Sequence, residues 1–159
     1  MIPNIPDQRV SPNAHIRGWG CLFSCYGALV QHYLKKLLSP IDVAKVFNIC
    51  IRDKSVWDNI TPTTLPGWYR AYCVEPEKII KSFGEYMHAD VKGEMLSRTE
   101  HISSTPGDCY TIVEMATANG SHFVIQSIAE GGFTSTLYDP WPRLKRTGVI
   151  RSYRHWRIS

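Results

Sequence analysis

Three residues in this sequence have side chains and local contexts that suit nucleophilic catalysis: Cys21, His122 and Asp139. Cys21 follows Gly18-Trp19-Gly20, which predicts a tight turn, and it opens a stretch with helical periodicity. A thiol in the first turn of a helix lies near unpaired backbone N–H groups and the positive end of the helix dipole, which favours the thiolate. The sequence therefore predicts that Cys21 is an activated nucleophile.

Cys25 is the competing candidate, because it lies one helical turn further on. The predicted helix ends near Leu38, and its apolar residues recur at the spacing of a core-facing stripe: Leu22, Cys25, Tyr26, Leu29, Val30, Tyr33, Leu34 and Leu37. Cys25 belongs to this stripe, where a free cysteine behaves as a small hydrophobic residue. Cys21 stands at the open end of the helix. The alternative is that both cysteines are core residues and the glycines only form a turn.

His122 and Asp139 lie in a region of short strand-like runs. These runs span residues 109–115, 122–128 and 133–138, and they predict sequential antiparallel strands. A symmetric hairpin around Glu130-Gly131 would pair Ile128 with Phe133, and counting outward would place His122 opposite Asp139. Directly opposed residues point to the same face with Cβ atoms about 4.5 to 5.5 Å apart. A bulge or a three-residue loop would change this register.

A carboxylate beside His122 would hold the imidazole in one tautomer and stabilise its protonated form. Each residue also has an ordinary interpretation: His122 as a core or turn histidine, and Asp139-Pro140 as the end of a strand. The combination of an activated cysteine, a histidine and an aspartate instead favours Cys-His-Asp catalysis of amide hydrolysis.

The sequence resembles the papain-like cysteine peptidases of bacteria, especially the family that processes bacteriocin leaders and its stand-alone relatives. The resemblance rests on Cys21, Cys25, Gly27-Ala28 and Tyr33 in the first helix, on His122-Phe123-Val124-Ile125, and on Tyr138-Asp139-Pro140-Trp141-Pro142. It implies an α+β, papain-like fold with an N-terminal nucleophile helix packed on an antiparallel sheet.

Gly18-Trp19-Gly20-Cys21 also resembles the cysteine motif of eukaryotic peptidases that process ubiquitin-like tags, although Trp141 stands where those enzymes have a histidine after Asp-Pro. The papain-like pattern places an oxyanion-hole glutamine about six residues before the cysteine. This sequence has His15 there, with Asn13 and Gln8 further upstream. His15 and Asn13 are therefore the candidate side-chain donors, beside the backbone N–H of Cys21. Trp19 and Trp141 are candidate cleft residues, and packing is the alternative role for both.

The length of 159 residues predicts one domain over residues 1–159. Residues 1–10 lack the pattern of a secretory signal, and no apolar run is long enough to span a membrane, so we expect cytoplasmic synthesis. We also expect the protein to be a monomer. The five cysteines are an odd number without dense metal-ligand spacing, which favours reduced thiols. We expect no metal and no cofactor.

Other segments predict supporting elements. Ser39-Pro40-Ile41-Asp42 opens a helix through Phe47, and Glu75-Pro76 opens another. The aromatic stretch 52–74 is either a loop pinned to the core or a wall of a substrate cleft. Residues 149–158 alternate like a final edge strand with a basic solvated face. A polyanion-binding surface is the alternative, but the net charge of +4 is small, and we expect no specific nucleic-acid partner.

The substrate is inferred from the overall character of the sequence. A small basic hydrolase without an export signal resembles a phage-type lysin, or endolysin, which acts on the cell wall after release and cuts peptidoglycan peptides as an endopeptidase or amidase. The alternatives are a protein-directed cysteine peptidase, either a maturation enzyme or an effector, and a catalytically inactive domain that binds peptides in the same cleft. Acyl transfer through the same intermediate is a further possibility.

Overall fold

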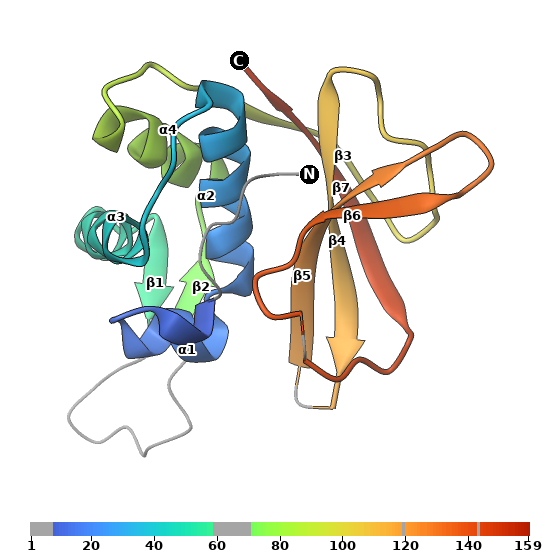
Figure 1. Cartoon of the computed structure of the whole chain (residues 1–159), viewed down its shortest axis with the longest axis horizontal. Coiled ribbons are helices and arrows are strands. Elements are labelled where there is room, and N and C mark those ends of the chain that lie inside the picture. Colours follow the sequence, from blue (N-terminus) through green and yellow to red (C-terminus); the bar gives the residue numbers. More distant parts are fainter. Residues whose placement is uncertain (1–7, 59–70, 119, 143) are drawn as a thin grey trace.

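The structure is a computed structural model that describes residues 8–58, 71–118, 120–142 and 144–159. It has the expected α+β organisation, with helices in the first half of the chain and an antiparallel sheet in the second half (Figure 1). The central helix α2 (Cys21–Leu34) lies between the other helices and the sheet.

The predicted tight turn before Cys21 is wrong, because Gly18 and Trp19 belong to a short helix, α1 (Ala14–Trp19). Gly20 alone joins α1 to α2, and its N–H donates to the carbonyl of Ile16. A Cβ at Gly20 would lie 2.6 Å from backbone atoms of Ile16. A side chain at this junction is therefore incompatible with the angle between the two helices.

The remaining helices follow the sequence signals closely. Helix α3 (Pro40–Arg52) has the predicted capping box, in which Ser39 and Asp42 bond each other's backbone N–H groups, but it extends past Phe47. Helix α4 (Pro76–Tyr86) starts at the predicted proline. Helix α2 ends four residues earlier than predicted, because Lys35 has a φ of 53° and the Gln31 side chain accepts the N–H of Leu38. The segment Gln8–Val10 forms one 3-10 turn, η1.

The main sheet has five strands in the order β3-β7-β4-β5-β6, and all neighbours are antiparallel. The strands are β3 (Gly93–Thr99), β4 (Cys109–Thr117), β5 (Gly120–Ile128), β6 (Thr134–Tyr138) and β7 (Ile150–Ile158). A separate ribbon pairs β1 (Val56–Asp58) with β2 (Ala71–Cys73). Residues 59–70 of the aromatic stretch lie outside the described residues.

The prediction that the last strand is an edge strand is wrong. β7 lies between β3 and β4, and most of its residues are at least partly buried. Its basic face is not simply solvated, since Arg154 pairs with Glu114 and Arg157 pairs with Glu94 and Asp108. β3 is not predicted from the sequence, because its seven residues show no clean apolar alternation.

The predicted register of the β5–β6 hairpin is also wrong. Ile128 pairs with Thr134 rather than Phe133, and Leu137 is an extra residue between the pairs Gln126–Thr136 and Ile125–Tyr138. This β-bulge reverses the alternation of β6 beyond Leu137. Continuing this register places Asp139, which follows the strand, opposite Val124. Val124 and His122 lie on the same face of β5, so Asp139 projects to the face of His122.

The core joins the helices to the sheet. Trp156 of β7 is fully buried, and its ring meets Tyr26 of α2 edge-on at a centroid distance of 5.4 Å. A second, smaller apolar cluster lies on the other face of the sheet and contains Val113, Val124, Ile128 and Tyr153. All five cysteines lie among the described residues and are free.

Within the described ranges, no helix has the length and hydropathy needed to cross a membrane. The same residues contain no cluster of His, Cys, Asp or Glu that could hold a metal ion.

Candidate functional site

The predicted contact between His122 and Asp139 is present. His122 Nε2 lies 2.7 Å from Asp139 Oδ1, and the His122 side chain is completely buried. The two residues are diagonal neighbours across the end of the hairpin instead of directly opposed, which long side chains can still bridge. The Leu137 bulge is what makes this contact possible.

The hydrogen bond fixes the tautomer of His122 when the imidazole is neutral. An ionised carboxylate only accepts, so Nε2 carries the proton and Nδ1 carries the lone pair. His122 Nδ1 is buried and has no hydrogen-bond partner within the described part of the chain. A buried imidazole with a free basic nitrogen is suited to accept a proton.

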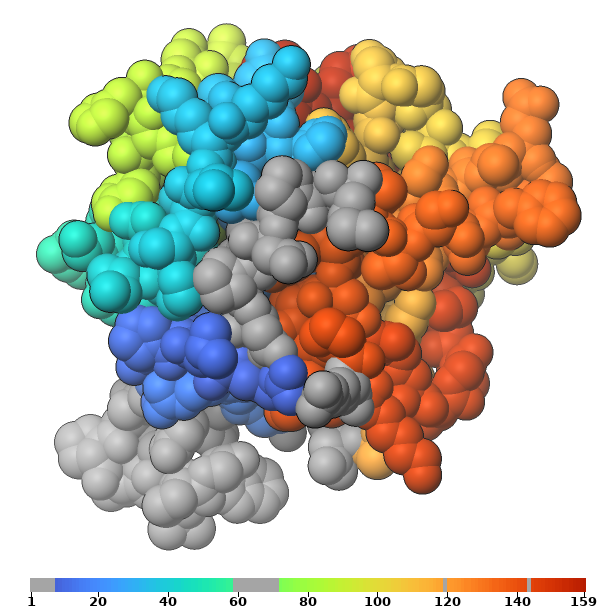
Figure 2. Space-filling view, in the orientation of Figure 1, coloured from blue at the N-terminus to red at the C-terminus, as the bar shows by residue number. Residues whose placement is uncertain are grey.

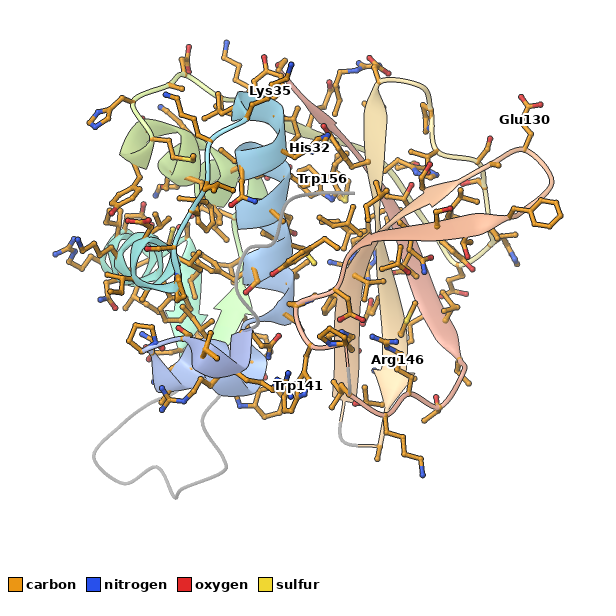
Figure 3. The ribbon with its side chains drawn as sticks, viewed as in Figure 1. His32, Lys35, Glu130, Trp141, Arg146 and Trp156 are labelled. Atoms are coloured by element: carbon orange, nitrogen blue, oxygen red, sulfur yellow. The ribbon has the colours of Figure 1, made fainter. Side chains whose placement is uncertain are left out.

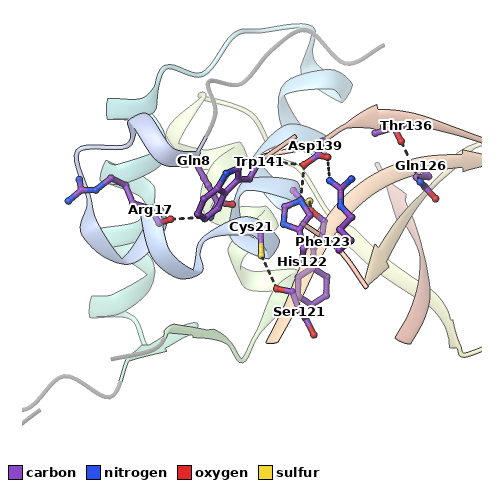
Figure 4. Close-up of polar contacts among 12 residues, drawn as sticks. Gln8, Arg17, Cys21, Ser121, His122, Phe123, Gln126, Thr136, Asp139 and Trp141 are labelled. Atoms are coloured by element: carbon purple, nitrogen blue, oxygen red, sulfur yellow. Dashed lines mark hydrogen bonds and ion pairs between the residues drawn. The ribbon is translucent and has the colours of Figure 1, made fainter. Parts of the chain in front are cut away.

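Cys21 lies beside this histidine at the start of α2 (Figure 4). Its Sγ is 3.9 Å from the carbonyl oxygen of Ser121, the residue before His122. One turn later, Cys25 Sγ is 3.5 Å from the carbonyl oxygen of Phe123. β6 pairs with β5 only from Ile125 onward, so the two thiols cover the part of the β5 edge that β6 leaves open.

The pKa of Cys21 departs from the sequence prediction. Burial raises the pKa of the Cys21 thiol to about 11, and nearby Asp139 also acts to raise it. Backbone N–H groups of Phe123, Leu22 and Cys21 act in the opposite direction but do not outweigh the loss of hydration. Burial therefore acts against the thiolate that the sequence predicts at Cys21, and the role of Cys21 as nucleophile stays a prediction.

Burial also raises the pKa of Cys25, which is fully buried within the main core. This agrees with the interpretation of Cys25 as a structural residue. Cys21 differs because it retains slight exposure, at 8 %, and stands at the junction of the two helices.

A network of hydrogen bonds on the sheet holds the side chain of Ser121. Its Oγ donates to Glu114 Oε1 at 2.8 Å, and Glu114 Oε2 accepts from Arg154 at 3.0 Å and from Ser152 at 2.9 Å. Burial acts to raise the pKa of Glu114, but the hydrogen bonds and Arg154 lower it below its usual value. The network fixes the start of β5, where His122 and the acceptor for Cys21 lie.

The two oxyanion candidates from the sequence lie in and just before α1. Asn13 caps this helix, since its Oδ1 accepts the N–H groups of His15 and Ile16. The His15 ring packs near Phe47, at a centroid distance of 6.0 Å. Their role as oxyanion donors stays a prediction.

Gln8, which precedes the two oxyanion candidates in the sequence, is a buried residue near the site. Its N–H donates to the carbonyl of Pro140 at 2.9 Å, and its Nε2 donates to the carbonyl of Arg17 at 3.2 Å. Its Oε1 is buried without a hydrogen-bond partner among the described residues. Gln8 thereby links the segment that follows β6 to α1, and Figure 2 shows the helical layer in blue and cyan and the last part of the sheet in orange on the same side of the molecule.

The two candidate cleft tryptophans flank this region. The backbone N–H of Trp141 donates to Asp139 Oδ1 at 2.9 Å, and the Arg9 guanidinium lies 5.9 Å above the Trp141 ring. A Cβ at Gly120 would lie 3.9 Å from the ring of Trp19, which places Trp19 beside the start of β5. Both are therefore near the His122–Asp139 pair or the strand that carries it.

Arg146 is a site residue that the sequence does not predict. Its Nη2 forms an ion pair with Asp139 Oδ2. The basic composition of the last twenty residues drew attention to the strand instead, and no spacing rule connects Arg146 to Asp139.

Comparisons with known proteins find no relative: the sequence matches no protein-family model, and no curated protein or solved structure matches it.

Proposed function

We propose that this protein is a cysteine hydrolase of the papain-like type, which cleaves amide bonds through Cys21, His122 and Asp139. The observation that supports it best is the buried His122, whose Nε2 is held by Asp139 and whose Nδ1 has no partner in the described structure. A cysteine at the start of a helix lies beside it.

The raised pKa of Cys21 means that His122 acts as a general base during attack, instead of forming an ion pair with the thiolate beforehand. In the resting structure the thiol points to the Ser121 carbonyl. Catalysis therefore requires Sγ to leave this carbonyl and approach His122 Nδ1 when substrate binds.

The first chemical step transfers the Cys21 proton to His122 Nδ1 as Sγ bonds to the carbonyl carbon of the substrate. The carbonyl electron pair moves onto oxygen and returns as the C–N bond breaks, and the amine leaves with the proton from Nδ1. A water then gives a proton to Nδ1 and its oxygen attacks the thioester. The C–S bond breaks, Sγ recovers the proton, and the carboxylic acid leaves.

The protein offers N–H groups near the developing negative charge. The backbone N–H groups of Cys21 and Leu22 act on Sγ, as their influence on its pKa shows. Such groups at a helix start would stabilise an oxyanion formed next to Sγ. Asn13, His15 and Gln8 are the side chains to test as additional donors.

Peptidoglycan peptides are the first substrate class to test, because the sequence favours a phage-type lysin. Purified peptidoglycan would be incubated with wild type, Cys21→Ala, His122→Ala and Cys25→Ala, and new amino groups would be counted with the fragments identified by mass spectrometry. The proposal expects release by wild type and Cys25→Ala, and loss of at least about a thousandfold in the other two variants.

Cys25→Ala is the matched control, since it makes the same substitution at a buried cysteine one turn away. Acid quenching during turnover should also trap an acyl group on Cys21, detectable as added mass. Wild-type turnover by Cys21→Ala would refute the proposal. If no variant hydrolyses amides but all bind the peptides in calorimetry, the peptide-binding alternative is correct.

A further inference from the structure

The carboxylate of Asp139 is held at both of its oxygens. Oδ1 accepts from His122 Nε2 at 2.7 Å and from the Trp141 N–H at 2.9 Å, while Oδ2 pairs with Arg146. The side chains of Asp139 and Arg146 are 13 % and 29 % exposed. One oxygen therefore faces the histidine, and the other is fixed by an arginine from a different segment.

The Arg146 segment is fastened to the sheet independently of β6. The next residue, Thr147, donates its N–H and its Oγ1 hydroxyl to the carbonyl of Ala116 at 3.1 and 3.3 Å, and the N–H of Ala116 donates to Val149 at 2.8 Å. Ala116 belongs to β4, which lies on the opposite side of β5 from β6. The Arg146–Asp139 pair thus lies across the N-terminal end of β5, which carries His122.

We propose that Arg146 is a positioning residue that holds Asp139 in place and ionised, so that Asp139 keeps His122 oriented with Nδ1 toward Cys21. The inference rests on the proposed function. In the resting state His122 must be neutral to act as a base, so its ring supplies no full positive charge to the buried carboxylate. Among the described residues, Arg146 is the cation paired with Asp139 at that stage, and an uncompensated carboxylate that is largely shielded from water would tend to protonate.

The groups that act on Asp139 come from three sides. They are His122 from β5, Arg146 from the segment after β6, and the thiols of Cys21 and Cys25 from α2. Burial acts to raise the pKa of Asp139, but the hydrogen bonds from His122 and Trp141 and the charge of Arg146 lower it below its usual value. Removing Arg146 deletes one lowering contribution, so the pKa of Asp139 should rise.

The experiment follows the ring nitrogens of His122 by ¹⁵N NMR across acidic pH, in wild type, Arg146→Gln and Arg146→Lys. The wild-type signals should show an inflection where Asp139 protonates, and Arg146→Gln should move this inflection to higher pH. Arg157→Gln is the matched control, because it removes an arginine whose partners Glu94 and Asp108 are exposed. The control should leave the inflection unchanged.

Arg146→Lys retains the charge with a different reach, so it should shift the inflection in the same direction by less. If Arg146→Gln does not fold, Arg146→Lys decides the question. Any folded Arg146 variant with an unshifted inflection overturns the proposal.

Turnover gives a second readout. In Arg146→Gln the acid limb of the pH–rate profile should move to higher pH. The turnover rate on the acid side of the profile should therefore fall by about ten- to a hundredfold. The NMR titration needs no substrate, so the two proposals can fail separately. A shifted inflection in a protein without hydrolytic activity refutes the hydrolase alone, and an active enzyme with an unshifted inflection refutes the role of Arg146 alone.

Discussion

The Cys21 thiol, whose pKa burial raises to about 11, is almost entirely protonated at neutral pH. At pH 8 about one molecule in a thousand carries the thiolate, compared with roughly a quarter for a free cysteine. We therefore expect iodoacetamide to alkylate Cys21 at least about a hundredfold more slowly than a free cysteine at this pH, with the rate rising about tenfold per pH unit up to pH 10.

Peptide mapping by mass spectrometry would measure this rate at Cys21, and Cys25→Ala should leave it unchanged. Fast alkylation at pH 6 that does not change up to pH 9 would instead indicate a preformed thiolate–imidazolium pair. This outcome would contradict the general-base mechanism and restore the activated thiolate that the sequence predicted.

The same raised pKa links Cys21 to folding stability. Between the ordinary thiol pKa of 9.0 and the folded value of about 11, the folded protein holds a proton that the unfolded chain has lost. Stability from this group is therefore complete below pH 9 and falls as pH rises toward 11, by about 2 to 3 kcal/mol in all. Urea unfolding at pH 8 and pH 10.5 should show a smaller pH-dependent loss in Cys21→Ala than in wild type, and equal losses would contradict the assignment.

The residues of the site were more predictable than their surroundings. Counting along a symmetric hairpin predicted that His122 and Asp139 meet, and the structure contains this contact, although the Leu137 bulge produces it and the counted register is wrong. The sequence gives no measure of burial at Cys21, because the burial comes from β5 and from the segments packed beside it. Arg146 was missed for a similar reason, since its contact with Asp139 depends on where the chain returns to β4.

At the scale of the elements, the junction between α1 and α2 allows a clear prediction about stability. A Cβ at Gly20 would lie 2.6 Å from the backbone of Ile16, which cannot move without shifting α1, whereas a Cβ at Gly18 meets nothing within 4 Å. Gly20→Ala should lower the free energy of unfolding by about 1 to 3 kcal/mol and displace Cys21. Gly18→Ala should be neutral or stabilising by up to about 1 kcal/mol. Chemical denaturation of both variants measures this, and equal effects would contradict the role of Gly20.

The Leu137 bulge is the second element-scale feature with a testable role. Deleting Leu137 would only remove the bulge, since Tyr138 would still face Ile125 and Asp139 would stay on the face of His122, whereas inserting an alanine between Tyr138 and Asp139 would turn Asp139 to the opposite face. The ¹⁵N signature of the His122–Asp139 bond should therefore disappear in the insertion variant and persist without Leu137. Deleting Glu130, which Figure 3 shows at the far tip of the hairpin, should shorten the loop and preserve the signature. Retention of the signature in the insertion variant would show that the register of β6 does not set this contact.

Local signals explain which elements were predicted correctly. The capping box at Ser39 and Asp42 is a short-range pattern, and α3 begins where it predicts. The Leu137 bulge follows from how β6 pairs with β5. The run Thr134–Tyr138 contains no glycine or other residue from which a bulge could be predicted. The hairpin register therefore could not be fixed by counting from the turn.

At the scale of the whole molecule, strand order was the least predictable feature. β7 pairs with β3 and β4, and β3 precedes it by about fifty residues in the sequence. Alternation shows that a strand forms but does not show which partners flank it. The result matters for the site, because a central β7 buries Trp156 against Tyr26 and so couples the sheet to α2.

This coupling predicts how stability is distributed. The site needs Cys21 from the helical layer and His122 and Asp139 from the sheet, and fully buried Trp156 is the largest side chain joining the two layers. Trp156→Ala should lower the free energy of unfolding by about 3 to 5 kcal/mol through the cavity it leaves. Trp57→Ala removes a tryptophan that is 52 % exposed and whose ring lies 5.6 Å from that of Tyr72 in the β1–β2 ribbon, so it should cost about 1 kcal/mol or less. Denaturant melts of both variants, followed by circular dichroism, make the comparison. A small effect at Trp156 would mean that the helical layer and the sheet are held together elsewhere, and that the geometry between Cys21 and His122 does not depend on this contact.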